Sequence, residues 1–246
     1  MNPLITCSLI VAALGAASVS LACELPTHAG MRLATNVELV QRADAIVLAR
    51  VIDGPAQGAR PDVSGLDQPR IVLEPIEVLK GGPLPNQKLR LFGSLFDWKG
   101  QPVKAAPTRL TEAHPNAYEG GCIRLQFAKG ALVVAMFKRE QSGLREMTYP
   151  LNRDVEDVPD VNSIWVRAVR LYVQATSVPA AEQRRTLNML QHRLQRSQSA
   201  DDREIAKDIR RYFRLGLRAK LQRDQLAGEF PTEMYSQRQL PTPSSR

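Results

Sequence analysis

The chain has 246 residues, of which 43% are hydrophobic and 24% are charged, and its formal net charge is +8 at pH 7. This length and composition fit one sizeable core, or one core with a small helical appendage, and they exclude a disordered or fibrous protein. The positive charge is unevenly placed, because Lys and Arg nearly balance Asp and Glu up to Gln183 and dominate from Arg184 onward.

The most apolar stretch of the sequence lies at its start. Residues 4–22 carry no charge, and Ser20 and Ala22 have the small-residue spacing that signal peptidase recognises. We therefore predict that residues 1–22 are an export signal and that Cys23 is the first residue of the mature protein. Two alternatives stay open here, an uncleaved membrane anchor and a lipid attached to Cys23.

Export also decides how the cysteines are interpreted. Removal of residues 1–22 takes Cys7 away and leaves Cys23 and Cys122. An exported protein reaches an oxidising compartment, where a remaining pair of cysteines is expected to form a disulfide. We therefore predict a periplasmic or secreted protein with one disulfide.

The first predicted elements are a short helix and two strands. Thr35 and Glu38 form a capping-box pattern, which predicts a helix that ends near Asp44. Residues 45–52 are apolar on both faces and predict a buried strand. The next strand spans residues 70–80, and its apolar positions change parity at Pro75, so we predict a bulge there.

Four further strands are predicted, one before and three after the long irregular segment that ends at Cys122. Alternating or continuous apolar patterns predict them over residues 88–94, 123–127, 131–140 and 144–149. The expected fold class is therefore α+β, with five or six antiparallel strands in a small closed or nearly closed barrel. We assign this barrel to residues 23–150.

From Val161 the apolar period becomes helical. Trp165 and Tyr172 share one stripe of a first helix, Pro179 opens a second, and Ser199 caps a third. We expect the helical aromatic residues to pack in the core. The helical appendage is assigned to residues 160–226, and residues 227–246 are expected to form a flexible tail.

The excess positive charge belongs to this helical appendage. It predicts either a solvated helix face or a surface for an anionic membrane. Nucleic acid is not an expected partner, because no aromatic residues alternate with the basic ones as a stacking platform. The residues assigned to this basic surface are Arg203, Lys207, Arg210, Arg211 and Arg214.

One proline-rich segment, residues 93–121, carries the large aromatic residues Phe96 and Trp98. Two such side chains in a loop form either a local plug against the barrel or an interaction patch. They are therefore a candidate contact surface for a partner protein.

Motifs of catalysis are absent from the sequence. His28, His114 and His192 lie far apart, without the spacing of metal ligands. There is neither a nucleophile elbow nor a glycine-rich phosphate loop. We therefore expect a protein that is not an enzyme and that needs no metal or cofactor.

The order of several fragments resembles the netrin-like domain of the tissue inhibitors of metalloproteinases. The fragments are a cysteine at the mature N-terminus, then "ADAIVLARV", "EVLKGG" and "GGCIRLQFAKGALVVAMF". The resemblance covers about residues 23–150. It implies an OB-type barrel in which Cys23 is bonded to Cys122, and its other matching positions are Lys80-Gly81, Phe127 and Gly130.

The resemblance also implies a second function. In these inhibitors, the α-amine and carbonyl of the first cysteine chelate the zinc of a protease, and the second residue enters the protease pocket. Here those positions are Cys23 and Glu24, and a carboxylate in that pocket would need costly desolvation. We therefore expect a non-enzymatic binding or scaffold module of the cell envelope with an unknown protein partner. Metalloprotease inhibition is the alternative.

The disulfide prediction is testable by mass spectrometry and by melting. The intact mature protein should begin at Cys23 and be oxidised, and Cys122→Ser should lower the melting temperature by many degrees. In the chain-entropy model, a disulfide that closes a loop of about 100 residues stabilises a fold by about 4–5 kcal/mol. A lipid on Cys23, or free thiols on both cysteines in protein from the envelope, would contradict the prediction.

Overall fold

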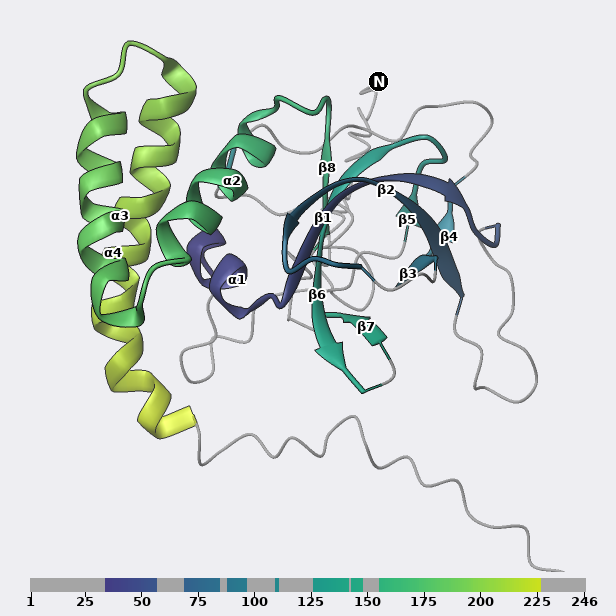
Figure 1. Cartoon of the computed structure of the whole chain (residues 1–246), viewed down its shortest axis with the longest axis horizontal. Helices are drawn as coiled ribbons and strands as arrows, with labels where there is room; N and C mark the ends of the chain where they lie inside the picture. The colour runs from purple at the N-terminus through teal and green to yellow at the C-terminus, as the bar shows by residue number, and fades with distance from the viewer. Residues whose placement is uncertain are drawn as a thin grey trace, which may run out of the picture.

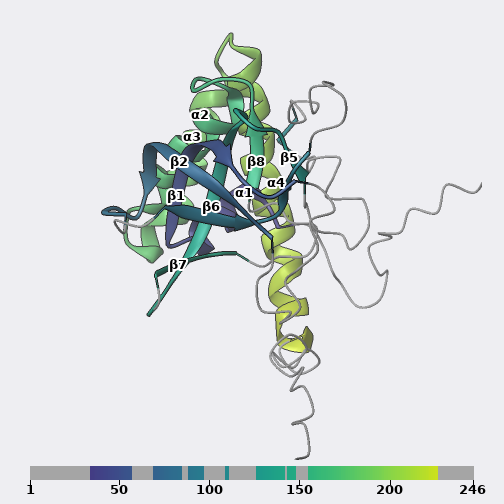
Figure 2. The ribbon, with the colours of Figure 1, turned by 90° about the vertical axis from the view of Figure 1, so that its right-hand side faces the viewer.

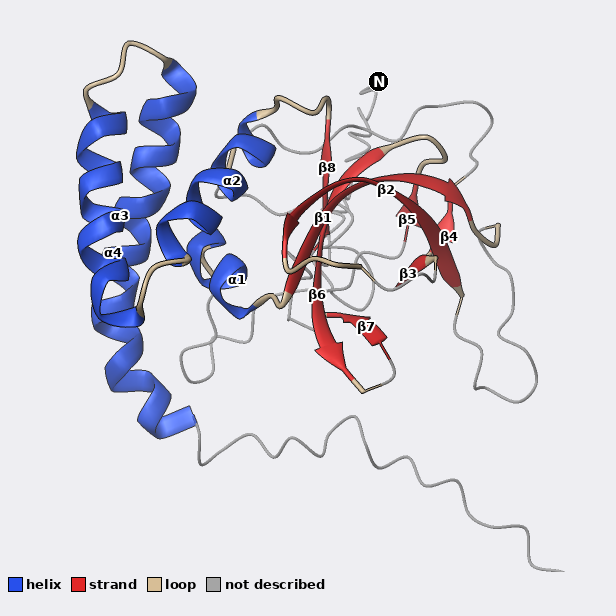
Figure 3. Ribbon diagram, in the orientation of Figure 1, coloured by secondary structure: helices blue, strands red, loops and turns tan. Residues whose placement is uncertain are grey.

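The computed structural model describes residues 34–56, 69–84, 88–96, 109–110, 126–141, 143–147 and 155–226. A short helix, α1 (Asn36–Arg42), precedes a curled sheet, and three helices follow it: α2 (Ile164–Thr176), α3 (Ala180–Gln195) and α4 (Ala200–Leu226). α1 and α2 lie between the sheet and the α3–α4 hairpin (Figure 1). The helices and the strands therefore occupy separate sides of the molecule (Figure 3).

The main sheet has six strands in the order β3-β2-β1-β6-β7, with β8 paired to another part of β6. All of these pairings are antiparallel. The α+β class with an antiparallel sheet is thus confirmed. The strands are β1 (Ala45–Asp53), β2 (Arg70–Lys80), β3 (Leu89–Phe92), β6 (Leu132–Glu140), β7 (Gly143–Glu146) and β8 (Val155–Val158).

The sheet curls strongly but does not close. Arg70 on β2 reaches across to Glu146 on β7, with 3.2 Å between Nη1 and Oε2. Within the described ranges, however, no strand ladder joins β3 to β7, so the sheet is not closed into a barrel. An apolar pattern indicates which faces of a strand are buried, but it does not indicate whether the two edge strands pair. The closure of the sheet could therefore not be predicted from it.

Strand β1 is buried on both faces. Val47 and Ala49 point into an inner core with residues of β2, β3, β5 and β6. Ile46 and Leu48 point the other way, into an outer core that they share with α1, α2, α3 and α4. The predicted buried strand is confirmed, and one strand therefore belongs to both cores.

The bulge predicted at Pro75 is also confirmed. Ala49 on β1 lies opposite Pro75, and the preceding residue Leu48 lies opposite Glu77, so Ile76 is an extra residue in β2. The extra residue lets Leu73 face the inner core while Leu79 faces the outer core. The two apolar residues on which the prediction rested, Ile76 and Val78, are 45% and 42% exposed, so the bulge is present but the apolar face that the pattern suggested after Pro75 is not buried.

The C-terminal end of α1 is tied to the ends of β2 and β6. The Lys80 ammonium donates hydrogen bonds to the carbonyl oxygens of Val40 and Ala43, at 2.7 and 2.6 Å. A cation at this end of a helix also interacts favourably with the helix dipole. Burial lowers the pKa of Lys80, although the charge of Asp44 acts in the opposite direction.

Asp44, which directly precedes β1, also links α1 to the end of β6. Its Oδ2 accepts from the backbone N–H of Arg139 at 2.9 Å, and its Oδ1 accepts from Lys138 at 3.1 Å. The Arg139 amide is the main cause of the lowered pKa of Asp44, and Lys138 adds to it. Gly81 packs against the backbone of Asp44 and has a positive φ of 74°.

The helical predictions are largely confirmed. The Thr35 and Glu38 capping box is present, and the Ser199 hydroxyl accepts from the backbone N–H of Asp202 at 3.4 Å. Trp165 and Tyr172 are buried in the outer core, as predicted for core aromatic residues. The second half of α4 extends beyond the sheet (Figure 2). None of the helices among the described residues is long and apolar enough to span a membrane.

Two features differ from the prediction. β4 (Ser94–Leu95) and β5 (Gln126–Phe127) form a small parallel sheet rather than joining the antiparallel one. Strand β8 was not predicted, because its central residues Glu156 and Asp157 are acidic and yet only 1% and 5% exposed. Composition alone places such residues at the surface.

The close packing of Gly81 against the backbone of Asp44 can be tested with a matched control. A Cβ on Gly81 would lie 1.9 Å from the carbonyl oxygen of Asp44, whereas a Cβ on Gly130, at φ +86°, would meet nothing within 4 Å. Gly130→Ala should lower the free energy of unfolding by about 1–2 kcal/mol, which is the backbone cost alone. Gly81→Ala should lower it by about 2–5 kcal/mol, because overpacking adds about 1–3 kcal/mol. Equal losses in urea denaturation would contradict this account.

Candidate anion-binding site

A buried polar network joins α1, α2 and α4. Asp208 on α4 is 1% exposed. Its Oδ2 accepts hydrogen bonds from Asn36 Nδ2 at 3.0 Å and from the Tyr172 hydroxyl at 2.8 Å. Asn36 also donates to the carbonyl oxygen of Leu110 at 2.8 Å. The network therefore fixes α4 against α1, α2 and residue 110.

The electrostatics of this network favour a neutral Tyr172. Burial raises the pKa of Tyr172 well above its usual value, and the nearby charge of Asp208 raises it further. The phenol thus keeps its proton and remains a hydrogen-bond donor to the carboxylate.

A pocket of about 620 Å³ lies along the same part of α4. The spacing of three and four residues brings its α4 side chains to one face of the helix. Glu204 links α4 to residue 110 at one side of the pocket, where its Oε1 accepts from the backbone N–H of Leu110 at 3.1 Å. We call this site the α4 pocket; its lining residues are Arg109, Leu110, Glu204, Lys207, Asp208, Arg211, Arg214 and Leu215.

The α4 pocket is rich in positive charge. Four of its lining side chains are cationic and two are carboxylates. The Nη1 atom of Arg211 is buried and has no hydrogen-bond partner in the described part of the chain. A buried donor without an acceptor is costly, and in native proteins it usually indicates a missing water or ion.

The structure divides the predicted basic surface. Lys207, Arg211 and Arg214 line the α4 pocket, whereas Arg203 and Arg210 do not. Arg203 instead donates to the carbonyl oxygens of Ser197 and Gln198, at 3.1 and 2.7 Å, and so supports the turn between α3 and α4. Arg210 is partly exposed.

The other predicted site residues are only partly described. Phe96 is partly buried, and its backbone N–H donates to the carbonyl oxygen of Phe127 at 2.8 Å. Trp98 lies outside the described residues, so the choice between plug and interaction patch stays a prediction. Cys23, Glu24 and Cys122 also lie outside them, and the disulfide and protease inhibition stay predictions as well.

Sequence reasoning missed several residues of the site. Asp208 follows Ile205 by three residues and precedes Ile209, and both isoleucines are fully buried. An acidic residue between such positions was a usable signal for a buried network. Arg109 and Asn36 gave no comparable signal, because their roles depend on contacts between distant segments.

The comparisons with known proteins leave the family open. No family model matches this chain, and no curated protein sequence matches it. Among the described residues, no group of three or more His, Cys, Asp or Glu side chains is placed to hold a metal ion.

The buried network can be tested by removing a single hydroxyl. Tyr172→Phe takes one donor from the buried Asp208 carboxylate and should lower the free energy of unfolding by about 1.5–3 kcal/mol. Tyr212→Phe is the matched control, because the Tyr212 hydroxyl makes only a 3.4 Å hydrogen bond to Gln41. We expect the control to cost less than about 0.5 kcal/mol. Similar small losses from both variants in urea denaturation would contradict a structural role of the network.

Proposed function

We propose that this protein is an exported, non-enzymatic binding module of the cell envelope that holds an oxyanionic ligand in the α4 pocket. The curled sheet and the helices packed on it form the support. The single observation that carries the proposal is the buried Nη1 of Arg211, which has no acceptor in the described part of the chain. A phosphate or carboxylate oxygen is the acceptor that a guanidinium binds best.

The neighbouring side chains support the same ligand class. Lys207 and Arg214 line the pocket beside Arg211, and both are exposed at its mouth. The carboxylates are engaged only in part, because Asp208 Oδ2 accepts from Asn36 and Tyr172 and Glu204 Oε1 accepts from Leu110, while the buried Asp208 Oδ1 has no hydrogen-bond partner among the described residues. The balance of charge therefore favours a ligand that carries more than one negative charge.

The lining residues also favour binding over catalysis. They include no Ser, Cys or His, and the carboxylates Glu204 and Asp208 are engaged in hydrogen bonds that hold the pocket together. Export and residence in the envelope rest on the expected signal in residues 1–22. The OB-type, netrin-like assignment is part of the same proposal, and the curled sheet with an inner core is compatible with an open barrel of that type.

Inorganic phosphate is a suitable first probe. In a buffer of low ionic strength, phosphate should raise the melting temperature of the intact protein in a saturable way. Arg211→Gln should weaken the apparent affinity about tenfold or more, which corresponds to about 1.4 kcal/mol. The matched control is Arg203→Gln, which removes the same charge from α4 outside the pocket and should leave the affinity unchanged. Equal losses from both variants would indicate non-specific attraction and would contradict the site.

A further inference from the structure

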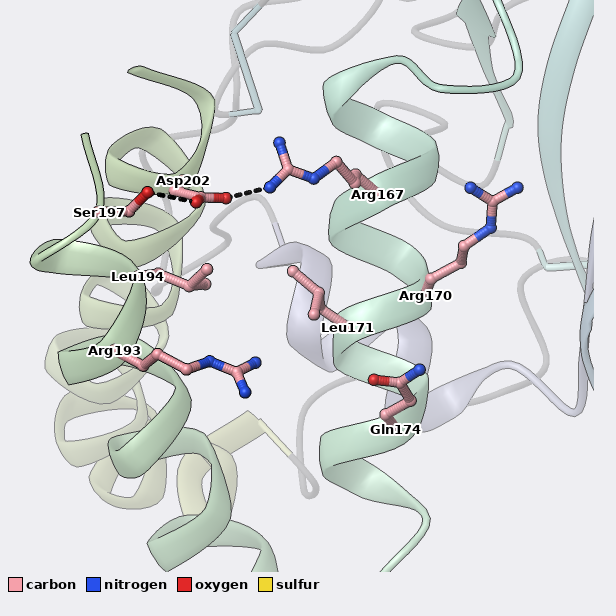
Figure 4. A pocket seen from close by; sticks show the side chains of 8 residues that line it. All are labelled: Arg167, Arg170, Leu171, Gln174, Arg193, Leu194, Ser197 and Asp202. Carbon is pink, nitrogen blue, oxygen red and sulfur yellow. Dashed lines mark hydrogen bonds and ion pairs between the residues drawn. The ribbon is translucent and has the colours of Figure 1, made fainter. Parts of the chain in front are cut away.

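A second hollow of about 500 Å³ lies between α2 and α3, and the start of α4 closes one end of it. Figure 4 shows that Leu171 on α2 and Leu194 on α3 face each other across this hollow. We call it the α2–α3 cleft. Polar side chains at the closed end of the cleft form hydrogen bonds or ion pairs with other residues. Those at the other end form none among the described residues.

The charged side chains near the closed end are already paired with other residues of the chain. Arg167 donates to the carboxylate of Asp202, and the second oxygen of that carboxylate accepts from the Ser197 hydroxyl at 2.6 Å. Arg170 points away from the cleft (Figure 4). It forms a bidentate pair with Glu77 on β2, at 3.1 and 2.5 Å. Neither guanidinium needs an external partner.

The open end is different. Arg193 reaches from α3 into the cleft, and Gln174 lies opposite it on α2 (Figure 4). Within the part of the chain that the structure describes, neither side chain has a hydrogen bond or an ion pair. One positive charge and one neutral amide therefore face the solvent beside an apolar floor of two leucines.

We propose that the α2–α3 cleft binds an organic carboxylate with an apolar chain. The carboxylate accepts a bidentate pair of hydrogen bonds from Arg193 and a further one from the Gln174 amide. The apolar chain covers Leu171 and Leu194. This ligand matches the charge of the cleft, because a single unpaired guanidinium neutralises a single carboxylate.

The proposed ligand differs from that of the α4 pocket. The α4 pocket offers several cations and two carboxylates, whereas the open end of the α2–α3 cleft offers one cation and apolar surface. The two sites also share no lining residue. The second proposal therefore stands independently of the first, and each can fail alone.

A simpler role for Arg193 is to stabilise the C-terminal end of α3, where it lies in the last turn. That role predicts a change of stability and no ligand. The experiment therefore measures binding directly, by calorimetric titration of the full mature chain with octanoate in a buffer free of other carboxylates. Circular dichroism checks that each variant is folded.

We expect saturable binding of octanoate by the wild-type protein and a loss of about tenfold or more in Arg193→Gln, the usual effect of a charge-assisted pair. Arg185→Gln is the matched control, since Arg185 is exposed on α3 and does not line the cleft. Its affinity should be unchanged. Shortening the ligand from octanoate to hexanoate should weaken binding, by about fourfold for each methylene lost.

Three results would overturn the proposal. The first is the absence of saturable octanoate binding by the wild-type protein. The second is equal affinity of the wild-type protein and folded Arg193→Gln. The third is equal affinity for octanoate and octylamine, which would show that the apolar floor binds chains without regard to the carboxylate.

Discussion

The structure depends above all on the burial of strand β1 on both of its faces. Its side chains alternate between an inner core inside the curled sheet and an outer core beneath the helices. Ladders to β2 and β6 satisfy the backbone of this strand on both sides. Residues 45–49 of this strand have no solvent face, so a slip by one residue would exchange the two sets of side chains between cores of different shape and is disfavoured. The sheet and the helices are thereby fixed relative to each other.

The two proposed binding sites inherit their geometry from this arrangement. The outer core holds α1 and α2 on the sheet, and these helices present Asn36 and Tyr172 to Asp208. That network orients α4 and, with it, the helix face that carries the cationic side chains of the α4 pocket. The α2–α3 cleft is held from the other side, where Arg170 bridges α2 to β2. Most lining residues of both sites lie on helices, which favours pre-organised binding, although Arg109, Leu110 and Ser197 come from segments between the elements.

Local features of the fold were predictable from sequence, and long-range features were not. The cap at Thr35 and the bulge at Pro75 have local signals, a capping box and a proline within a strand, so sequence reasoning found both. Strand β8 was missed because buried acidic residues have no local signature. The basic character of α4 was also evident, but its pocket was not. The pocket requires Arg109 and Leu110 to meet a helix that follows them by almost 100 residues, and such meetings are set by the whole packing.

The outer core also determines how the chain can be divided. Its members come from both sides of residue 160, with Ile46 and Val134 before it and Val169 and Ile209 after it. A cut there would divide the outer core and leave each piece with a bare apolar surface, whereas the inner core, whose members all precede residue 160, would stay in the first piece. The pieces would be complementary, however, since each carries the surface that covers the other. The molecule is therefore suited to reconstitution from two separately produced fragments, and each fragment alone would tend to aggregate.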